Sequence, residues 1–223
     1  MAKEGLPILL FEAVLIFASY IIFYRVLNGG PFGTVVLSLL CVFFVFSIYF
    51  FRDPERKIPE GENLIVSPAD GKIVDISTQQ ESFYCGREMI KISIFLNVFN
   101  VHVNRFPCEG RVEFFKYVPG KFFNAAKEKA SLENEQTIIG IQTGTHGKIL
   151  VKQIAGLIAR RVVCRVSEGD SLERGDRFGM IRFGSRTDLF LPPGTELLIK
   201  KDQVVYGGET VIGKFPVESE NSK

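Results

Sequence analysis

The sequence is poor in histidine and tryptophan, and it carries little net charge. It has two histidines, no tryptophan, and 27 lysines and arginines against 25 aspartates and glutamates, which gives a formal net charge of +2. These charges are interspersed along the chain. Binding to a nucleic-acid backbone needs a basic stripe, because the phosphates must be neutralised by cations. We therefore expect no nucleic-acid partner.

Cysteine is also scarce, and the cysteines are far apart. The sequence contains no C-x-x-C pair among its four cysteines, which are Cys41, Cys85, Cys108 and Cys164. Such spacing favours reduced, mostly buried thiols over a disulfide framework. A zinc site would have to combine His102 and His146 with scattered carboxylates. We therefore expect no metal site.

Long apolar runs occur only near the N-terminus. Residues 31–51 carry no charged side chain, and a membrane span needs about 20 apolar residues. Residues 5–24 form a similar run that includes Glu12, and a carboxylate is costly at the bilayer centre. For this first run, a span with Glu12 near the interface and a shallow or re-entrant segment both stay open. We predict a transmembrane helical hairpin as an anchor over residues 1–52.

The basic residues around the apolar runs indicate an orientation. Arg52, Arg56 and Lys57 follow the second run, whereas Arg25 stands alone between the two runs. Lysine and arginine collect on the cytoplasmic side of membrane proteins. We therefore expect the domain that follows to lie on the cytoplasmic face of the cell (inner) membrane.

From Asp53 onward, short β-prone runs alternate with glycine turns. The clearest strand alternates Ile90, Ile92 and Ile94 with Lys91 and Ser93, which is typical of a half-buried strand. Such spacing predicts a mainly β domain, an antiparallel sandwich or barrel, over residues 53–216, with a polar tail at 217–223. Expected strands are 64–66, 72–76, 89–96, 148–154, 162–166, 180–183, 189–191 and 197–199, with one helix at 120–135. An echo between residues 70–74 and 146–150 is compatible with a duplicated β unit.

The dipeptide Gly184-Ser185 has the chemistry for self-cleavage. Glycine lacks a Cβ, so the hydroxyl of the following serine can approach the glycine carbonyl and the backbone can hold a strained conformation. Attack would convert the peptide bond into an ester, and elimination followed by loss of ammonia would leave a pyruvoyl ketone. A flexible turn is the ordinary alternative for Gly-Ser.

Two further residue patterns supply acid–base groups. Asp70 lies in the turn sequence Ser67-Pro68-Ala69-Asp70-Gly71, which would otherwise be a hairpin turn. His102 follows an apolar strand and is one of only two histidines available as a proton carrier.

The stretch 117–125 combines a turn, a cation and aromatic side chains, and is either a packed loop or a lip that touches lipid or substrate.

Taken in order, these patterns resemble the phosphatidylserine decarboxylase proenzyme family of the short bacterial and archaeal type. The resemblance covers residues 51–215. It rests on residues 51–54, 67–71, 100–105, 117–125, 133–135, 153–156 with Arg160 and Arg161, and 178–185.

The resemblance implies how the chain matures and acts. Cleavage between Gly184 and Ser185 would give a large β chain, 1–184, and a small α chain, 185–223, which begins with a covalent pyruvoyl group made from Ser185. Through a Schiff base with that group, phosphatidylserine in the membrane would become phosphatidylethanolamine and carbon dioxide. Neither a metal nor pyridoxal phosphate is needed.

The family's aspartate falls on Asp70, its histidine on His102 and its self-processing serine on Ser185. Longer members have a second histidine where this chain has Arg105, so His102 could serve self-cleavage, with Asp70 as the orienting group, or decarboxylation, or both. Arg186, Arg105 and Lys121 are the candidates for contact with the phosphate or carboxylate of the substrate. A homo-oligomer is compatible with the sequence.

Three other readings remain open. A membrane-tethered serine hydrolase would use Ser185, His102 and Asp70, although the chain lacks a G-x-S-x-G elbow around Ser185. A lipoyl-like adaptor would be one uncut chain without enzymatic activity, but it lacks an evident lysine at a hairpin tip. An archaetidylserine decarboxylase would apply the same headgroup chemistry to an ether-linked lipid.

Overall fold

The computed structural model describes residues 1–121, 133–156, 162–182 and 185–216. The chain divides into two compact units, Met1–Pro54 and Glu55–Lys223. We treat each unit by itself.

The first unit is a hairpin of two apolar helices, as the sequence predicts. A short helix η1 (Lys3–Gly5) leads into α1 (Leu6–Tyr20), which continues as the π-helix η2 (Ile21–Val26), and α2 (Pro31–Phe50) returns. Both helical segments, Lys3–Val26 and Pro31–Phe50, are long and apolar enough to cross a membrane. The helices approach closely at Gly33, because a Cβ there would lie 2.8 Å from the Cβ of Phe23.

Glu12 lies between these two helices. Its side chain is 8% exposed, and the hydroxyl of Ser47 on α2 donates a hydrogen bond of 2.8 Å to Glu12 Oε1. A polar pair of this kind joins neighbouring helices where water is scarce. From the sequence, the carboxylate of Glu12 is costly at the bilayer centre. The structure gives it a hydrogen-bond partner, Ser47, on the other helix.

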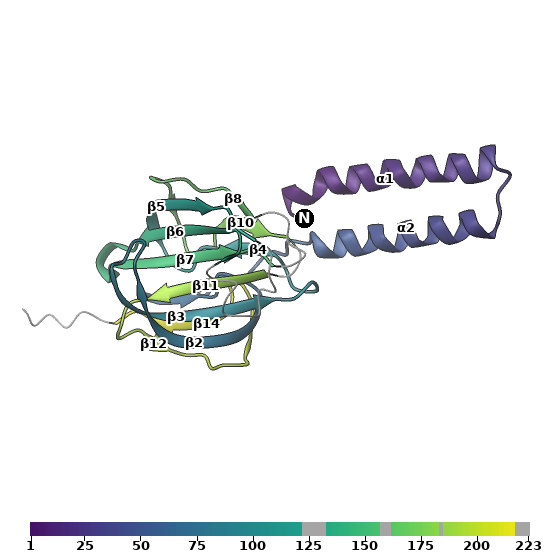
Figure 1. Cartoon of the computed structure of the whole chain (residues 1–223). Helices are drawn as coiled ribbons and strands as arrows, with labels where there is room; N and C mark the ends of the chain where they lie inside the picture. Colours follow the sequence, from purple (N-terminus) through teal and green to yellow (C-terminus); the bar gives the residue numbers. More distant parts are fainter. Residues whose placement is uncertain (122–132, 157–161, 183–184, 217–223) are drawn as a thin grey trace, which may run out of the picture. The chain divides into compact units, whose positions relative to one another are not determined.

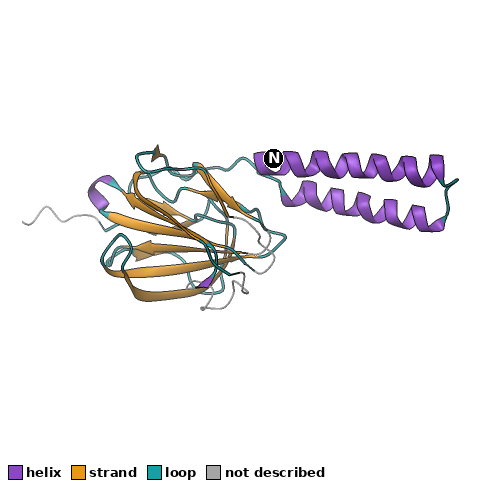
Figure 2. Ribbon diagram, turned by 45° about the horizontal axis from the view of Figure 1, so that its top comes forward, coloured by secondary structure: helices purple, strands orange, loops and turns teal. Residues whose placement is uncertain are grey.

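The second unit is built from three antiparallel sheets (Figures 1 and 2). The largest has eight strands in the order β13-β2-β3-β11-β7-β6-β5-β9. Their bounds are β13 (Val204–Val205), β2 (Gly71–Glu81), β3 (Arg87–Leu96), β11 (Ser185–Leu191), β7 (Lys148–Ile154), β6 (Gln136–Gln142), β5 (Gly110–Val118) and β9 (Ser171–Leu172). The mainly β fold predicted from the sequence is therefore confirmed.

Two three-stranded sheets complete this unit. One has the order β4-β10-β8, with β4 (Val103–Arg105), β10 (Arg177–Ile181) and β8 (Val162–Cys164). The other has the order β1-β14-β12, with β1 (Leu64–Val66), β14 (Val211–Lys214) and β12 (Glu196–Leu197). A short helix η3 (Gly144–His146) precedes β7. The main core combines side chains of all three sheets, including Ile65, Ile94, Val151, Phe178 and Leu189.

Several predicted elements need correction. The strand expected at 189–191 begins at Ser185, and the strands β5 and β6 were not predicted. At the ends of the helix expected at 120–135, Lys121 forms a β-bridge with Asn134, whereas Glu133 is helical, and 122–132 lies outside the described residues. The strand of Ile90, Ile92 and Ile94 is not half-buried, because Lys91 and Ser93 on its other face are 2% and 1% exposed. The suggested duplication of 70–74 and 146–150 stays a prediction.

Candidate active site

Ser185 is the first residue of β11, which is a central strand of the eight-stranded sheet (Figure 1). It pairs with Leu96, the last residue of β3. Side chains alternate along a strand, so Ser185 shares a face with Thr187 and with the core residues Leu189 and Leu191. Ser185 is 0% exposed, and its Oγ has no hydrogen-bond partner among the described residues. Gly184 lies outside the described residues.

His102 follows β3 through a tight turn. The turn is closed by a hydrogen bond from Asn100 N to Asn97 O (3.1 Å) and by one from Asn97 N to Asn100 Oδ1 (2.9 Å). His102 is 0% exposed, and its Nδ1 lies 2.9 Å from Asn100 O. Because a carbonyl oxygen only accepts, Nδ1 carries the hydrogen, and the neutral ring then has its lone pair on Nε2.

The backbone of His102 lies beside the strand that leads into the dipeptide Gly184-Ser185. Ile181, the last residue of β10, donates its N–H to His102 O at 3.3 Å. Only three residues separate Ile181 from Ser185. The fold therefore brings the segments of His102 and Ser185 together from two different sheets.

Asp70 occupies the turn between β1 and β2 and is 4% exposed. Nη2 of Arg56 donates to both of its carboxylate oxygens, at 3.0 and 2.9 Å, and Gly207 N donates to Oδ1 at 2.8 Å. Arg56 Nη1 also donates to Glu209 Oε2 at 3.0 Å. The next residue, Gly71, must be glycine, since a Cβ there would clash with the carbonyl oxygen of Phe95. Asp70 is thus held in place by a cation and by backbone.

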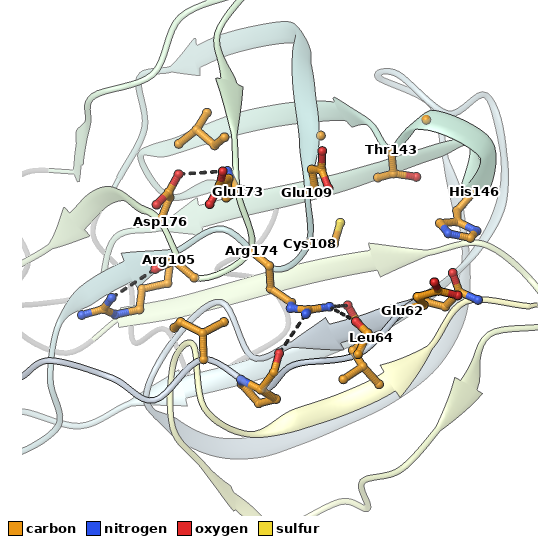
Figure 3. A pocket seen from close by; sticks show the side chains of 18 of the residues that line it. Glu62, Leu64, Arg105, Cys108, Glu109, Thr143, His146, Glu173, Arg174 and Asp176 are labelled. Carbon is orange, nitrogen blue, oxygen red and sulfur yellow. Dashed lines mark hydrogen bonds between the residues drawn. The ribbon is translucent and has the colours of Figure 1, made fainter.

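A large open cavity lies elsewhere on this unit (Figure 3). Its volume is about 1390 Å³, and neither Ser185 nor His102 lines it. Arg174 in its wall donates to the carbonyls of Pro59, Gly61 and Leu64, so its donors are directed to backbone. The second histidine, His146, also lines this cavity and stacks on Phe215, with ring centroids 4.6 Å apart. His102 is therefore the histidine that the fold associates with Ser185.

Comparison with known proteins identifies the family. A family model described as phosphatidylserine decarboxylase matches residues 43–213. The chain belongs to the phosphatidylserine decarboxylase family. Phosphatidylserine decarboxylase proenzymes of Rickettsia akari (strain Hartford) and Rickettsia prowazekii (strain Madrid E) are each 49% identical to it over 184 residues, 80% of this chain and 80% of the relative. The proenzyme of Rickettsia conorii (strain ATCC VR-613 / Malish 7) is 49% identical over 178 residues, 78% of this chain and 77% of the relative.

Membership in the phosphatidylserine decarboxylase family makes this protein a carboxy-lyase and confirms the resemblance stated from the motifs. A pyruvoyl group made from Ser185, which the family resemblance implies, fits the residues present. The hydroxyl it would consume is buried, and no described residue engages it in a hydrogen bond.

The structure does not bring Arg186 to the face of β11 that carries Ser185. Neighbouring residues of a strand point to opposite faces, and Arg186 Nη2 donates to Asp188 Oδ2 at 2.9 Å on the far side. Lys152 is near this pair, and burial lowers its pKa while the charge of Asp188 opposes that shift. The side chain of Arg186 therefore belongs to a buried ionic cluster behind the strand, and its contact with substrate stays a prediction.

The other two predicted substrate contacts lie apart from one another. Arg105 is 5% exposed, lines the large cavity and donates from Nη1 to Gly175 O at 3.1 Å. Lys121 is exposed, with its Nζ 3.4 Å from Glu133 Oε2. Arg160, Arg161 and residues 122–125 lie outside the described residues. Contacts of Arg105 and Lys121 with substrate stay predictions.

Sequence reasoning missed the residues that hold these groups in place. Arg56 was read only as an orientation signal next to the apolar run, yet it binds Asp70. Asn104 and Gln153 were noted as parts of motifs without a role, yet their side-chain amides are hydrogen-bonded to each other beside the strands of the site. The available signal was an amide side chain in each of two predicted motifs, together with a cation in the segment that precedes β1.

Proposed function

We propose that this chain is a proenzyme that splits its own backbone between Gly184 and Ser185, converts Ser185 into an N-terminal pyruvoyl group, and decarboxylates phosphatidylserine to phosphatidylethanolamine. One observation carries the proposal. The Ser185 hydroxyl is buried at the start of β11, without a described hydrogen-bond partner. An unpaired buried hydroxyl costs about 1–3 kcal/mol, so its presence supports a chemical use of this side chain.

The proposed splitting needs no hydrolytic water. Ser185 Oγ attacks the carbonyl carbon of Gly184, and the C–N bond breaks as the C–O bond forms, which leaves an ester and a free amine. A base then removes the Ser185 Cα proton, and Gly184 departs as a carboxylate that keeps the former hydroxyl oxygen. The dehydroalanine that remains takes up one water, releases ammonia and becomes a ketone.

His102 is the proton carrier in this proposal. Its Nδ1–H is directed to Asn100 O, and we assign Nε2, which carries the lone pair of the neutral ring, as the atom that accepts a proton during splitting. Arg105, at the place of the longer members' second histidine, is directed to Gly175 O, and His146 stacks on Phe215. We therefore assign both the proton removal in splitting and the later proton delivery to the substrate Cα to His102, with Asp70 as the supporting carboxylate.

The mature site would act on a lipid headgroup. When present, the pyruvoyl ketone supplies an electron sink, because it condenses with the substrate amine and takes up the electron pair left when carbon dioxide departs. Protonated His102 delivers the hydrogen that replaces the carboxylate on Cα. The apolar helical hairpin would tether the catalytic unit to the membrane that contains the lipid, and Arg52, Arg56 and Lys57 support the cytoplasmic face of the inner membrane.

Mass spectrometry of the purified full-length protein tests this proposal. We expect two chains, one ending at Gly184 and one from residue 185 to Lys223 that is lighter by one ammonia than a hydrolytic fragment would be. Ser185→Ala should remain one chain and release no carbon dioxide from phosphatidylserine vesicles. An active wild-type preparation with an intact chain and an unmodified Ser185 would refute the proposal.

A further inference from the structure

We propose that Asn104 is a positioning residue whose carboxamide fixes the segments of Asp70, His102 and Ser185 relative to one another. This inference rests on the self-processing proposed above. Asn104 is 0% exposed and lies on β4, two residues after His102. Its side chain reaches the other two segments directly.

The hydrogen bonds of Asn104 connect all three segments. Nδ2 donates to Pro68 O at 3.3 Å, two residues before Asp70, and to Thr187 Oγ1 at 3.1 Å, two residues after Ser185. Oδ1 accepts from Gln153 Nε2 at 2.8 Å. Both amide hydrogens and the amide oxygen are therefore engaged.

The network continues into the large sheet. Gln153 Oε1 accepts from Thr137 Oγ1 at 2.7 Å, and both residues are almost fully buried. Gly179 on β10 leaves room for this amide, because a Cβ there would lie 2.7 Å from Gln153 Nε2. The position of the Asn104 carboxamide is thus itself fixed by neighbours on β7 and β6.

These side-chain bonds matter because backbone pairing does not join the two strands involved. β4 belongs to the sheet β4-β10-β8, whereas β11 belongs to the eight-stranded sheet. β4 is only three residues long, and its pairing with β10 has a register shift between Arg177 and Gly179. Within the described part of the chain, the bonds of Asn104 to Thr187 and Gln153 cross from one sheet to the other.

The directional hydrogen bonds of Asn104 would control how accurately the reacting groups are placed. Apolar packing fills space without fixing an angle, whereas an amide with three partners permits one arrangement. A displacement of about 1 Å between reacting groups can lower a rate by about a hundredfold. The attack of Ser185 on Gly184 would need such accuracy between residues carried by separate sheets.

The experiment measures the rate of chain splitting after cell-free synthesis, with stability measured separately on unsplit chains that carry Ser185→Ala. For Asn104→Ala and the milder Thr187→Val we expect splitting about ten- to a hundredfold slower at temperatures well below unfolding. The double variant should be slowed by less than the product of the single effects, because both remove the same link.

Thr195→Val is the matched control. Thr195 is 7% exposed and donates to Pro192 O at 2.8 Å, so the change also removes a buried hydroxyl bond but leaves the three segments untouched. We expect this variant to split at the wild-type rate. Equal splitting by Thr187→Val and wild type, or equal slowing by Thr195→Val at the same loss of stability, would overturn the role of Asn104. A wild-type chain that never splits would refute the proposed function instead.

Discussion

Nη2 of Arg56 donates to both carboxylate oxygens of Asp70, at 3.0 and 2.9 Å, and both side chains are nearly buried, at 8% and 6% exposure. The stability of an ion pair buried in this way depends on both partners being present. Loss of one partner leaves an uncompensated charge in a poorly solvated place. The buried charge of Asp70 therefore depends on Arg56 for its stabilisation. Arg56 contacts Asp70 directly, although it is far in sequence from His102 and Ser185.

Replacement of Arg56 by methionine tests this dependence. Arg56→Met keeps an unbranched side chain but removes the cation, and we expect a loss of about 3 kcal/mol in the free energy of unfolding. Arg177→Met is the control, because Arg177 pairs with Glu55 at an exposed position (42% and 90% exposure), where a pair contributes about 1 kcal/mol or less. Denaturant unfolding of both variants on the Ser185→Ala chain gives the comparison. Similar losses would contradict the buried character of the Arg56–Asp70 pair.

The two histidines should differ sharply in their effect on maturation. The amide of His102→Asn can still donate to Asn100 O but cannot accept a proton as Nε2 does. We expect it to fold and to split at least about a hundredfold more slowly, which is the usual contribution of a general base. His146→Asn should split normally, since His146 stacks on Phe215 in the wall of the large cavity. Gel analysis over time measures the splitting rate of each variant. Normal splitting of His102→Asn would refute the proposed role of His102.

The Cys85 thiol predicts a pH dependence of stability. Burial, followed by the negative charge of Glu81, raises the pKa of Cys85 from 9.0 to about 12. The folded state therefore holds the thiol proton more tightly than the unfolded state does. The resulting stabilisation is complete below pH 9 and is lost as the pH rises toward 12.

Unfolding free energies of wild type and Cys85→Ala, both with Ser185→Ala, between pH 8 and 11 check this dependence. The wild-type value should fall more steeply above pH 9 than the value for Cys85→Ala. Parallel curves would show that the thiol titrates alike in both states.

The split chains should stay together in native buffer. β11 pairs with β3 on one side and β7 on the other, so the proposed small chain supplies a central strand between two strands of the large chain. Size-exclusion chromatography in mild detergent should recover both chains in one peak, and denaturant should separate them. Recovery of a free small chain without denaturant would contradict the observed pairing.

Local sequence patterns were sufficient to predict the fold class, but they misjudged where charges lie. The strands at 89–96 and 148–154 were found from alternation, and glycine marked the turns. The strand of Ser185 was expected to begin at Leu189, after the charged residues Arg186 and Asp188. In the structure they form a buried pair behind β11, so a charge pattern that normally indicates solvent marked an ionic cluster.

The sequence named candidate residues for the site but did not predict how they are arranged. Ser185, His102 and Asp70 were named from motif order, since each motif is short and local. The supports of these residues are distant in sequence: Gly207 N binds Asp70, and Thr187 binds Asn104. Such contacts depend on how separate sheets pack, which alternation and turn residues do not specify.

The place of Ser185 at the head of a central strand would give the proposed maturation a fixed order of events. Ser185 reaches these surroundings only when β11 pairs with β3 and β7, and the chain end created by scission would then lie in the interior. If splitting occurs as proposed, it would depend on correct folding. A misfolded precursor would keep its peptide bond, and the reactive carbonyl would arise only in molecules whose sheets had already assembled around Ser185.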